Sequence, residues 1–169
     1  MRHDLAHLYP FRFSLRVPEA GNHPARDIDI RVAFSSHCFT QKCLDGTHDS
    51  AFSSAHDWRK FCLERYALSM QLPDIIRDLD RRKCYFNFKN SRQRNYITLD
   101  VLDGAGAPTE YLVFFDVRHA GEDQAVLVFV QSAFPAGIAP KPHGISRKKV
   151  GFRVLVSLAL QNRKPRPPA

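Results

Sequence analysis

The segment Ser35-Ser36-His37-Cys38-Phe39-Thr40 places hydroxyls, an imidazole and a thiol within six residues. A histidine titrates near neutral pH and can move a proton, while neighbouring hydroxyl groups can hold a phosphate or orient the base. We therefore take His37 as a candidate catalytic residue and Ser36 and Thr40 as candidate substrate-binding residues. The structural alternative is a capped strand end, in which His37 only satisfies a local carbonyl.

A second group of polar residues lies at or near the expected ends of later strands. Cleaving RNA without a metal needs a group to take the 2′-hydroxyl proton, cations for the charge on phosphate, and an acid for the leaving oxygen. The structural alternative is a solvated rim of arginines. The candidates are Arg94, Arg118 and His119 for catalysis, and Arg92, Tyr96, Gln131 and Ser132 for substrate binding.

The C-terminal part of the chain is strongly basic. Residues 141–169 contain eight Lys or Arg and no Asp or Glu, and the whole chain has a formal charge of +8 and a pI near 9.6. Such a stretch favours a polyanion partner over a merely solubilising face. We expect Arg147, Lys148, Lys149 and Arg153 to contact a nucleic-acid backbone, with RNA favoured. Five contacts to single-stranded phosphates would give a log–log salt slope of about −3.5.

Cysteine and histidine also crowd the region from residue 37 to residue 62. Six of these side chains are of types that bind zinc, namely His37, Cys38, Cys43, His48, His56 and Cys62. However, the Cys38-x4-Cys43 spacing is not that of a zinc knuckle, and no second closely spaced pair follows. We therefore predict no metal and no cofactor, and free thiols throughout.

The length and composition indicate one domain over residues 1–163, followed by a disordered, basic, proline-rich tail over residues 164–169. The N-terminus lacks the apolar region of a secretory signal, and the longest apolar runs are too short to span a bilayer. A cytoplasmic protein without a membrane partner is expected. No nucleotide loop, zinc-protease helix or nucleophile elbow is present.

Alternation of apolar and polar residues predicts strands over 11–17 and 28–34. Ser54 to Asp57 has the form of a capping box, which predicts a helix carrying Trp58, Phe61, Cys62, Leu68 and Leu72 on one face. Pro73 would kink that helix or open a second one. The helical region should end near residues 81–83.

Period-two alternation returns over residues 96–101, and a turn at 103–108 leads into a partner strand over 111–117. The almost continuous apolar run at 125–134 is typical of a central strand, and residues 150–160 are expected to form the last strand. The predicted class is α+β, an antiparallel β-sheet with two N-terminal strands, one or two helices and then a meander of three or four strands. Helices on one face would leave the opposite face available.

Several runs resemble small bacterial proteins described as stationary phase growth adaptation proteins. These runs are residues 34–40, 111–118, 128–134 and 150–157, and the resemblance would span most of the chain. The predicted architecture, helices followed by a basic antiparallel meander, is also similar to RelE-type ribonuclease toxins. That likeness implies a ribonuclease by fold analogy and supplies no catalytic residue.

The sequence thus favours an RNA-binding protein, a metal-independent endoribonuclease of the bacterial growth-inhibiting toxin type. His37 or His119 would act as base or acid, and Arg94 and Arg118 would stabilise the transition state. The alternative is a non-enzymatic nucleic-acid-binding protein in which His37 is structural. A third possibility is a basic module that docks an acidic protein partner, such as an inhibitor or antitoxin.

Overall fold

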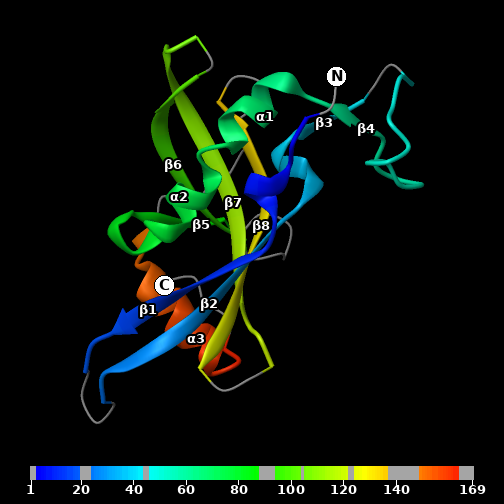
Figure 1. Ribbon diagram of the computed structural model, residues 1–169. Helices are drawn as coiled ribbons and strands as arrows, with labels where there is room; N and C mark the ends of the chain where they lie inside the picture. The colour runs from blue at the N-terminus through cyan, green and yellow to red at the C-terminus, as the bar shows by residue number, and fades with distance from the viewer. Residues whose placement is uncertain are drawn as a thin grey trace.

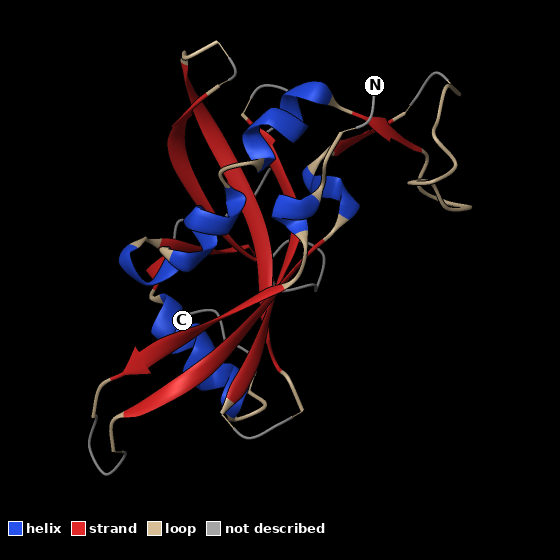
Figure 2. Cartoon of the chain, in the orientation of Figure 1, coloured by secondary structure: helices blue, strands red, loops and turns tan. Residues whose placement is uncertain are grey.

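The computed structural model describes residues 3–19, 24–43, 46–87, 94–103, 105–121, 124–136 and 149–163. Within these ranges one large sheet is accompanied by short helices and a small β-ribbon (Figures 1 and 2). The strands are β1 Phe11–Val17, β2 Arg26–Phe34, β3 Thr40–Lys42, β4 Arg59–Phe61, β5 Cys84–Asn87, β6 Arg94–Leu102, β7 Pro108–His119, β8 Ala125–Pro135 and β9 Lys149–Val150. The helices are α1 Leu63–Ser69, α2 Leu72–Arg77 and α3 Phe152–Leu160, with 3₁₀ turns η1 Ala6–Leu8, η2 Ser36–Cys38 and η3 Leu79–Arg81.

The strand order of the large sheet is β1-β2-β8-β7-β6-β5-β9 over the described ranges. The predicted α+β class is therefore confirmed, and the sheet is mostly antiparallel. One pair departs from the prediction, because β2 runs parallel to β8, with Phe34 opposite Val130. A parallel pair needs a long crossover, and helices α1 and α2 and the β3–β4 ribbon lie in that connection.

The hydrophobic core lies on one face of the sheet. Alternate residues of β2, β7 and β8, such as Ile30, Tyr111 and Val128, pack there against apolar residues of all three helices. On the opposite side of β1 and β2, Arg12 pairs with Asp29 at 2.8 Å and Arg16 with Asp27 at 2.9 Å. The apolar residues of the alternating pattern thus face the core, and the charged residues between them lie on the opposite face of the sheet.

Two expected elements are wrong in type. Residues 150–160 were expected to be a strand, but Phe152–Leu160 forms helix α3, whose buried residues Phe152, Leu155, Val156 and Ala159 follow helical spacing. The helix expected from Ser54 begins only at Leu63, because residues 59–61 pair with β3 and Ser54 bridges to Asp57. Consequently Arg59 is buried. Trp58 is half exposed, although the predicted helix would have placed it on the apolar face.

A β-bulge interrupts the pairing of β7 with β8. Val130 lies opposite Phe115 and Ser132 opposite Phe114, so Gln131 is the extra residue. Bulges bend a strand and redirect side chains, and they are common next to functional sites. Here the bulge lies where β2 has ended, beside η2.

Candidate functional site

His37 lies in η2, immediately after β2 leaves the sheet. The Ser35 backbone N–H donates to the Val130 carbonyl at 2.9 Å, and the Ser35 hydroxyl accepts from the His37 backbone N–H at 3.2 Å. A serine in extended conformation that caps the following turn is a common helix start. The end of β2 is thereby fixed to β8, and this contact positions His37.

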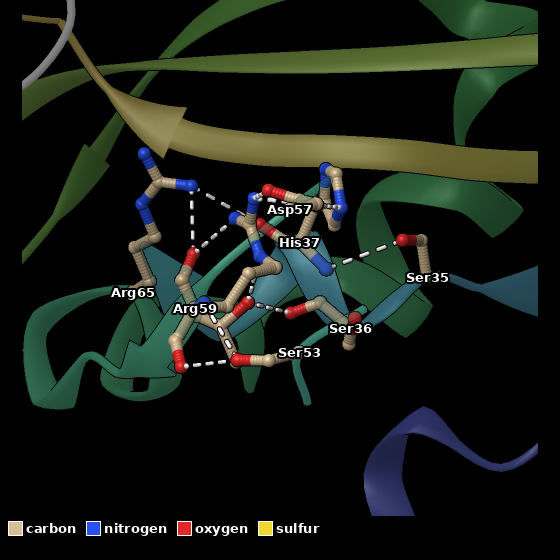
Figure 3. Close-up of polar contacts among 8 residues, drawn as sticks. Ser35, Ser36, His37, Ser53, Asp57, Arg59 and Arg65 are labelled. Carbon is tan, nitrogen blue, oxygen red and sulfur yellow. Dashed lines mark hydrogen bonds and ion pairs between the residues drawn. The ribbon is translucent and has the colours of Figure 1, made fainter. Parts of the chain in front are cut away.

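The His37 imidazole pairs with Asp57, which comes from the segment before β4. Its Nε2 lies 2.9 Å from Oδ2 of Asp57 (Figure 3). A carboxylate accepts only, so Nε2 carries the hydrogen and Nδ1 of the neutral ring has the lone pair. Nδ1 has no hydrogen-bond partner among the described residues. With 39% of the side chain exposed, the imidazole combines an orienting carboxylate with access from solvent.

Arg59 on β4 connects this pair to the turn beneath it. Its Nη1 donates to Asp57 at 3.2 Å, its Nε to the Thr40 hydroxyl at 2.7 Å, and its Nη2 to the Thr40 carbonyl at 3.0 Å. The Thr40 hydroxyl in turn donates to the Ser36 carbonyl at 2.7 Å. Ser53 also bonds the Arg59 backbone in both directions. Figure 3 shows these contacts converging below the imidazole.

Arg65 from α1 is a second buried guanidinium at the same place. Its Nη1 donates to the carbonyls of His37 at 3.2 Å and Thr40 at 2.9 Å. Its Nε has no hydrogen-bond partner, and neither does the fully buried Tyr111 hydroxyl. Burial raises the pKa of that phenol well above its usual range. Burial also raises the pKa of the Cys38 thiol to about 12, so Cys38 is not a nucleophile.

Burial is the main cause of a lowered pKa at His37, and the charge of Arg59 lowers it further. The Asp57 carboxylate acts in the opposite direction without reversing the shift. The imidazole is therefore neutral at physiological pH and able to accept a proton. Two guanidinium groups and one carboxylate surround it, so the local field favours an anion.

The structure brings three of the predicted site residues together, namely Ser36, His37 and Thr40. Thr40 is fully buried, so its hydroxyl holds the turn instead of facing a substrate. Asp57, Arg59 and Arg65 were missed by the sequence analysis. The sequence places Asp57 in a helix cap. No local pattern predicts its contact with His37, which lies twenty positions away in the chain.

The predicted residues of the meander are divided between the two ends of the β2–β8 pair. Arg118 pairs with Asp116 at 3.1 Å, and the Gln131 amide also donates to Asp116. His119 accepts from the Gly121 N–H at 3.0 Å. His119 pairs with Val126, four residues along β8 from Val130, or about 13 Å from the level at which η2 begins. The two histidines therefore lie at opposite ends of the β2–β8 pair, and Ser132 lies at the end near His37.

The basic residues predicted to contact a nucleic-acid backbone do not lie beside His37 in the part of the chain that the structure describes. Arg153 makes a bidentate pair with Asp80 at 2.6 Å. Lys149 is exposed on β9, four strands from β8, or about 19 Å away. Arg92, Arg147, Lys148 and residues 164–169 lie outside the described ranges, as do the side chains of Arg94 and Tyr96.

The cysteines and remaining histidines are dispersed. Cys38, Cys43 and Cys62 are buried free thiols, and His48 stacks on Trp58 instead of approaching them. Among the described residues, no three His, Cys, Asp or Glu side chains gather as they would around a metal ion.

A second histidine, His7, lies at hydrogen-bond distance from a serine hydroxyl, as in the histidine–serine pair of a hydrolase, but it does not act as the base of such a pair. Nε2 of His7 lies 2.8 Å from the Ser69 hydroxyl. That hydroxyl donates its only hydrogen to the Tyr66 carbonyl at 2.7 Å and is fully buried. His7 must therefore donate to Ser69, and the contact attaches the N-terminal segment to α1.

The sequence model of the YjaZ family matches residues 1–160, which is nearly the whole chain. The chain belongs to the YjaZ family. No curated protein and no protein of solved structure matches it. Across the described ranges of this YjaZ-family protein, no helix is long and apolar enough to cross a membrane. Membership names no reaction, so the chemistry has to be argued from the His37 site.

Proposed function

We propose that this YjaZ-family protein binds RNA and cleaves it without a metal, with His37 as the proton-transfer residue. The observation that supports this most directly is the 2.9 Å contact between Nε2 of His37 and Asp57 on a partly exposed imidazole. Such a pair fixes the tautomer and leaves the other ring nitrogen as a base. The site therefore resembles the part of an acid–base active site that supplies the general base.

The reaction that suits this group is transfer of the phosphodiester to the neighbouring 2′-oxygen. Nδ1 of His37 takes the 2′-hydroxyl proton, the 2′-oxygen bonds to phosphorus, and the bond from phosphorus to the 5′-oxygen breaks. Solvent protonates the leaving oxygen. The products are a 2′,3′-cyclic phosphate and a 5′-hydroxyl, and no external oxidant or metal enters the balance.

Arg59 and Arg65 support this step through the electrostatic field of their positive charges. Their N–H groups that appear in hydrogen bonds serve protein acceptors, so their contribution is to stabilise negative charge on phosphate at short range. A buried cation acts more strongly than a solvated one, because little water screens it.

A non-enzymatic RNA-binding protein is the second candidate. It is favoured by the wide separation of His119 from His37, since the second histidine predicted for catalysis does not lie near the first. In that case the basic surface predicted from the sequence holds the RNA and His37 is structural. Docking of an acidic inhibitor and growth inhibition both stay predictions from the sequence.

The experiment is incubation of the purified protein with total RNA in EDTA, comparing wild type with His37→Asn. We expect cleavage by the wild type and a loss of about 10²–10⁴-fold in the variant. His56→Asn is the matched control, since His56 is exposed and lies next to Asp57. Binding without cleavage would favour the second candidate, and neither binding nor cleavage would reject both.

A further inference from the structure

The chain has a single tryptophan, and the structure leaves it half exposed. Trp58 directly precedes β4, and 47% of its surface is accessible. Its ring stacks on His48 with centroids 5.0 Å apart and planes inclined by 22°. This is the geometry of an offset aromatic stack. A large planar surface is thus presented to solvent instead of being buried in the core.

Backbone contacts hold both rings in place. The Trp58 carbonyl accepts from the Cys43 N–H at 2.8 Å, and Nδ1 of His48 lies 3.1 Å from the Gly46 carbonyl. Gly46 has φ +77°, a conformation that a residue with a Cβ rarely adopts. The Asp49 N–H also donates to the Arg59 carbonyl at 2.8 Å. The stack is therefore pre-organised by residues 46–58, which lead into β4 and project beyond the sheet (Figure 1).

The two strands that flank the stack are basic. Strands β3 and β4 contribute Lys42, Arg59 and Lys60 and no carboxylate. The described part of the segment between these strands has two carboxylates: Asp57 pairs with His37 and Arg59, and Asp49 accepts from the Ala51 N–H at 2.9 Å. A nucleotide offers a π face for the rings and a phosphate for the cations, and bases of single-stranded RNA stack on aromatic side chains in this way.

We propose that the Trp58–His48 stack is a platform that binds a nucleobase of single-stranded RNA. Trp58 follows Asp57 in the chain, so the platform belongs to the same segment before β4 as the residue that orients the imidazole. This inference rests on the proposed function and names the substrate feature that the site recognises.

Fluorescence of Trp58 reports on the platform directly, because no other tryptophan contributes. The full chain is titrated with a 2′-O-methyl oligouridine, which cannot be cleaved, and with an abasic oligomer of equal length and charge. Quenching by the oligouridine alone supports the platform. Equal responses to both oligomers, or none, would overturn it.

Affinity for a labelled copy of the oligouridine provides the second measurement. Trp58→Ala should bind about 5- to 150-fold more weakly, and Trp58→Phe should retain most of the affinity. Tyr9→Ala is the control, since Tyr9 is an exposed aromatic residue near η1. Because the fluorescence titration uses wild-type protein, a misfolded alanine variant would not remove the test.

The two proposals fail in distinguishable ways. RNA cleavage that depends on His37, together with Trp58 fluorescence that does not distinguish the oligouridine from the abasic oligomer, would reject the platform and retain the catalytic function. Base-dependent quenching without cleavage would retain the platform and reject catalysis at His37.

Discussion

Oδ2 of Asp57 meets Nε2 of His37 at 2.9 Å, joining the loop before β4 to the turn after β2. The same carboxylate lies 3.2 Å from Nη1 of Arg59, so it bridges an imidazole and a buried cation. An arrangement of this kind sets both the orientation of the imidazole and its readiness to accept a proton.

Replacing Asp57 by Asn should separate these two effects. Cleavage should fall by about 10²-fold or more, since the ring loses the group that fixes its tautomer. The carboxylate raises the pKa of His37, so its removal should lower that pKa further. The acid limb of the pH–rate profile, where the base becomes protonated, should therefore move to lower pH. A profile that stays in place or moves upward would contradict this account of the pair.

Replacing Arg59 by Met should destabilise the fold. Arg59 is 5% exposed and donates to Thr40 and Asp57, so its loss leaves buried acceptors without a donor. We expect a decrease of about 1.5–3 kcal/mol in the free energy of unfolding, measured by urea denaturation. Arg81→Met is the control, because the Arg81 side chain is 86% exposed, and it should stay within about 0.5 kcal/mol of wild type. Equal effects of the two substitutions would show that Arg59 does not hold the turn.

Replacing Arg153 by Gln distinguishes a structural arginine from an RNA contact. Hydrogen bonds from Arg153 lower the pKa of Asp80, so this carboxylate stabilises the fold above its unfolded pKa and loses that contribution as the pH falls through the folded value. The variant should therefore lose stability at neutral pH and show a weaker dependence on pH below about 4. Both groups are partly exposed to solvent, which screens the pair, so the change should be small.

RNA affinity should stay close to wild type in the same variant, because the guanidinium is already bound to Asp80. A marked loss of affinity with unchanged acid stability would restore Arg153 to the binding surface predicted from the sequence.

The sequence was most informative where a single periodicity applied. Strand β1 has the bounds that alternation predicts, and β8 lies between β2 and β7 as its continuous apolar run indicates. The segment 150–160 fits two periods at once, since Phe152 and Val156 lie on one face of either a strand or a helix. Burial of Leu155 and Ala159 shows that the helical period applies, and that spacing was already visible in the sequence.

The candidate site was only half predictable. Local composition pointed to Ser36 and His37 because they occupy one short segment. The contacts of Asp57, Arg59 and Arg65 depend on the pairing of β3 with β4 and on the packing of α1 against η2. These are long-range arrangements, and a buried arginine in particular contradicts the local expectation that cations lie outside.

The most direct test of catalysis by His37 uses an oligodeoxynucleotide that contains one ribonucleotide, incubated with wild-type protein in EDTA. The proposed mechanism predicts a single cut at that position, a 2′,3′-cyclic phosphate detected by mass spectrometry, and loss of the cut in His37→Asn. An intact oligonucleotide, or an equal rate of cutting by the His37→Asn variant, would contradict proton transfer by His37.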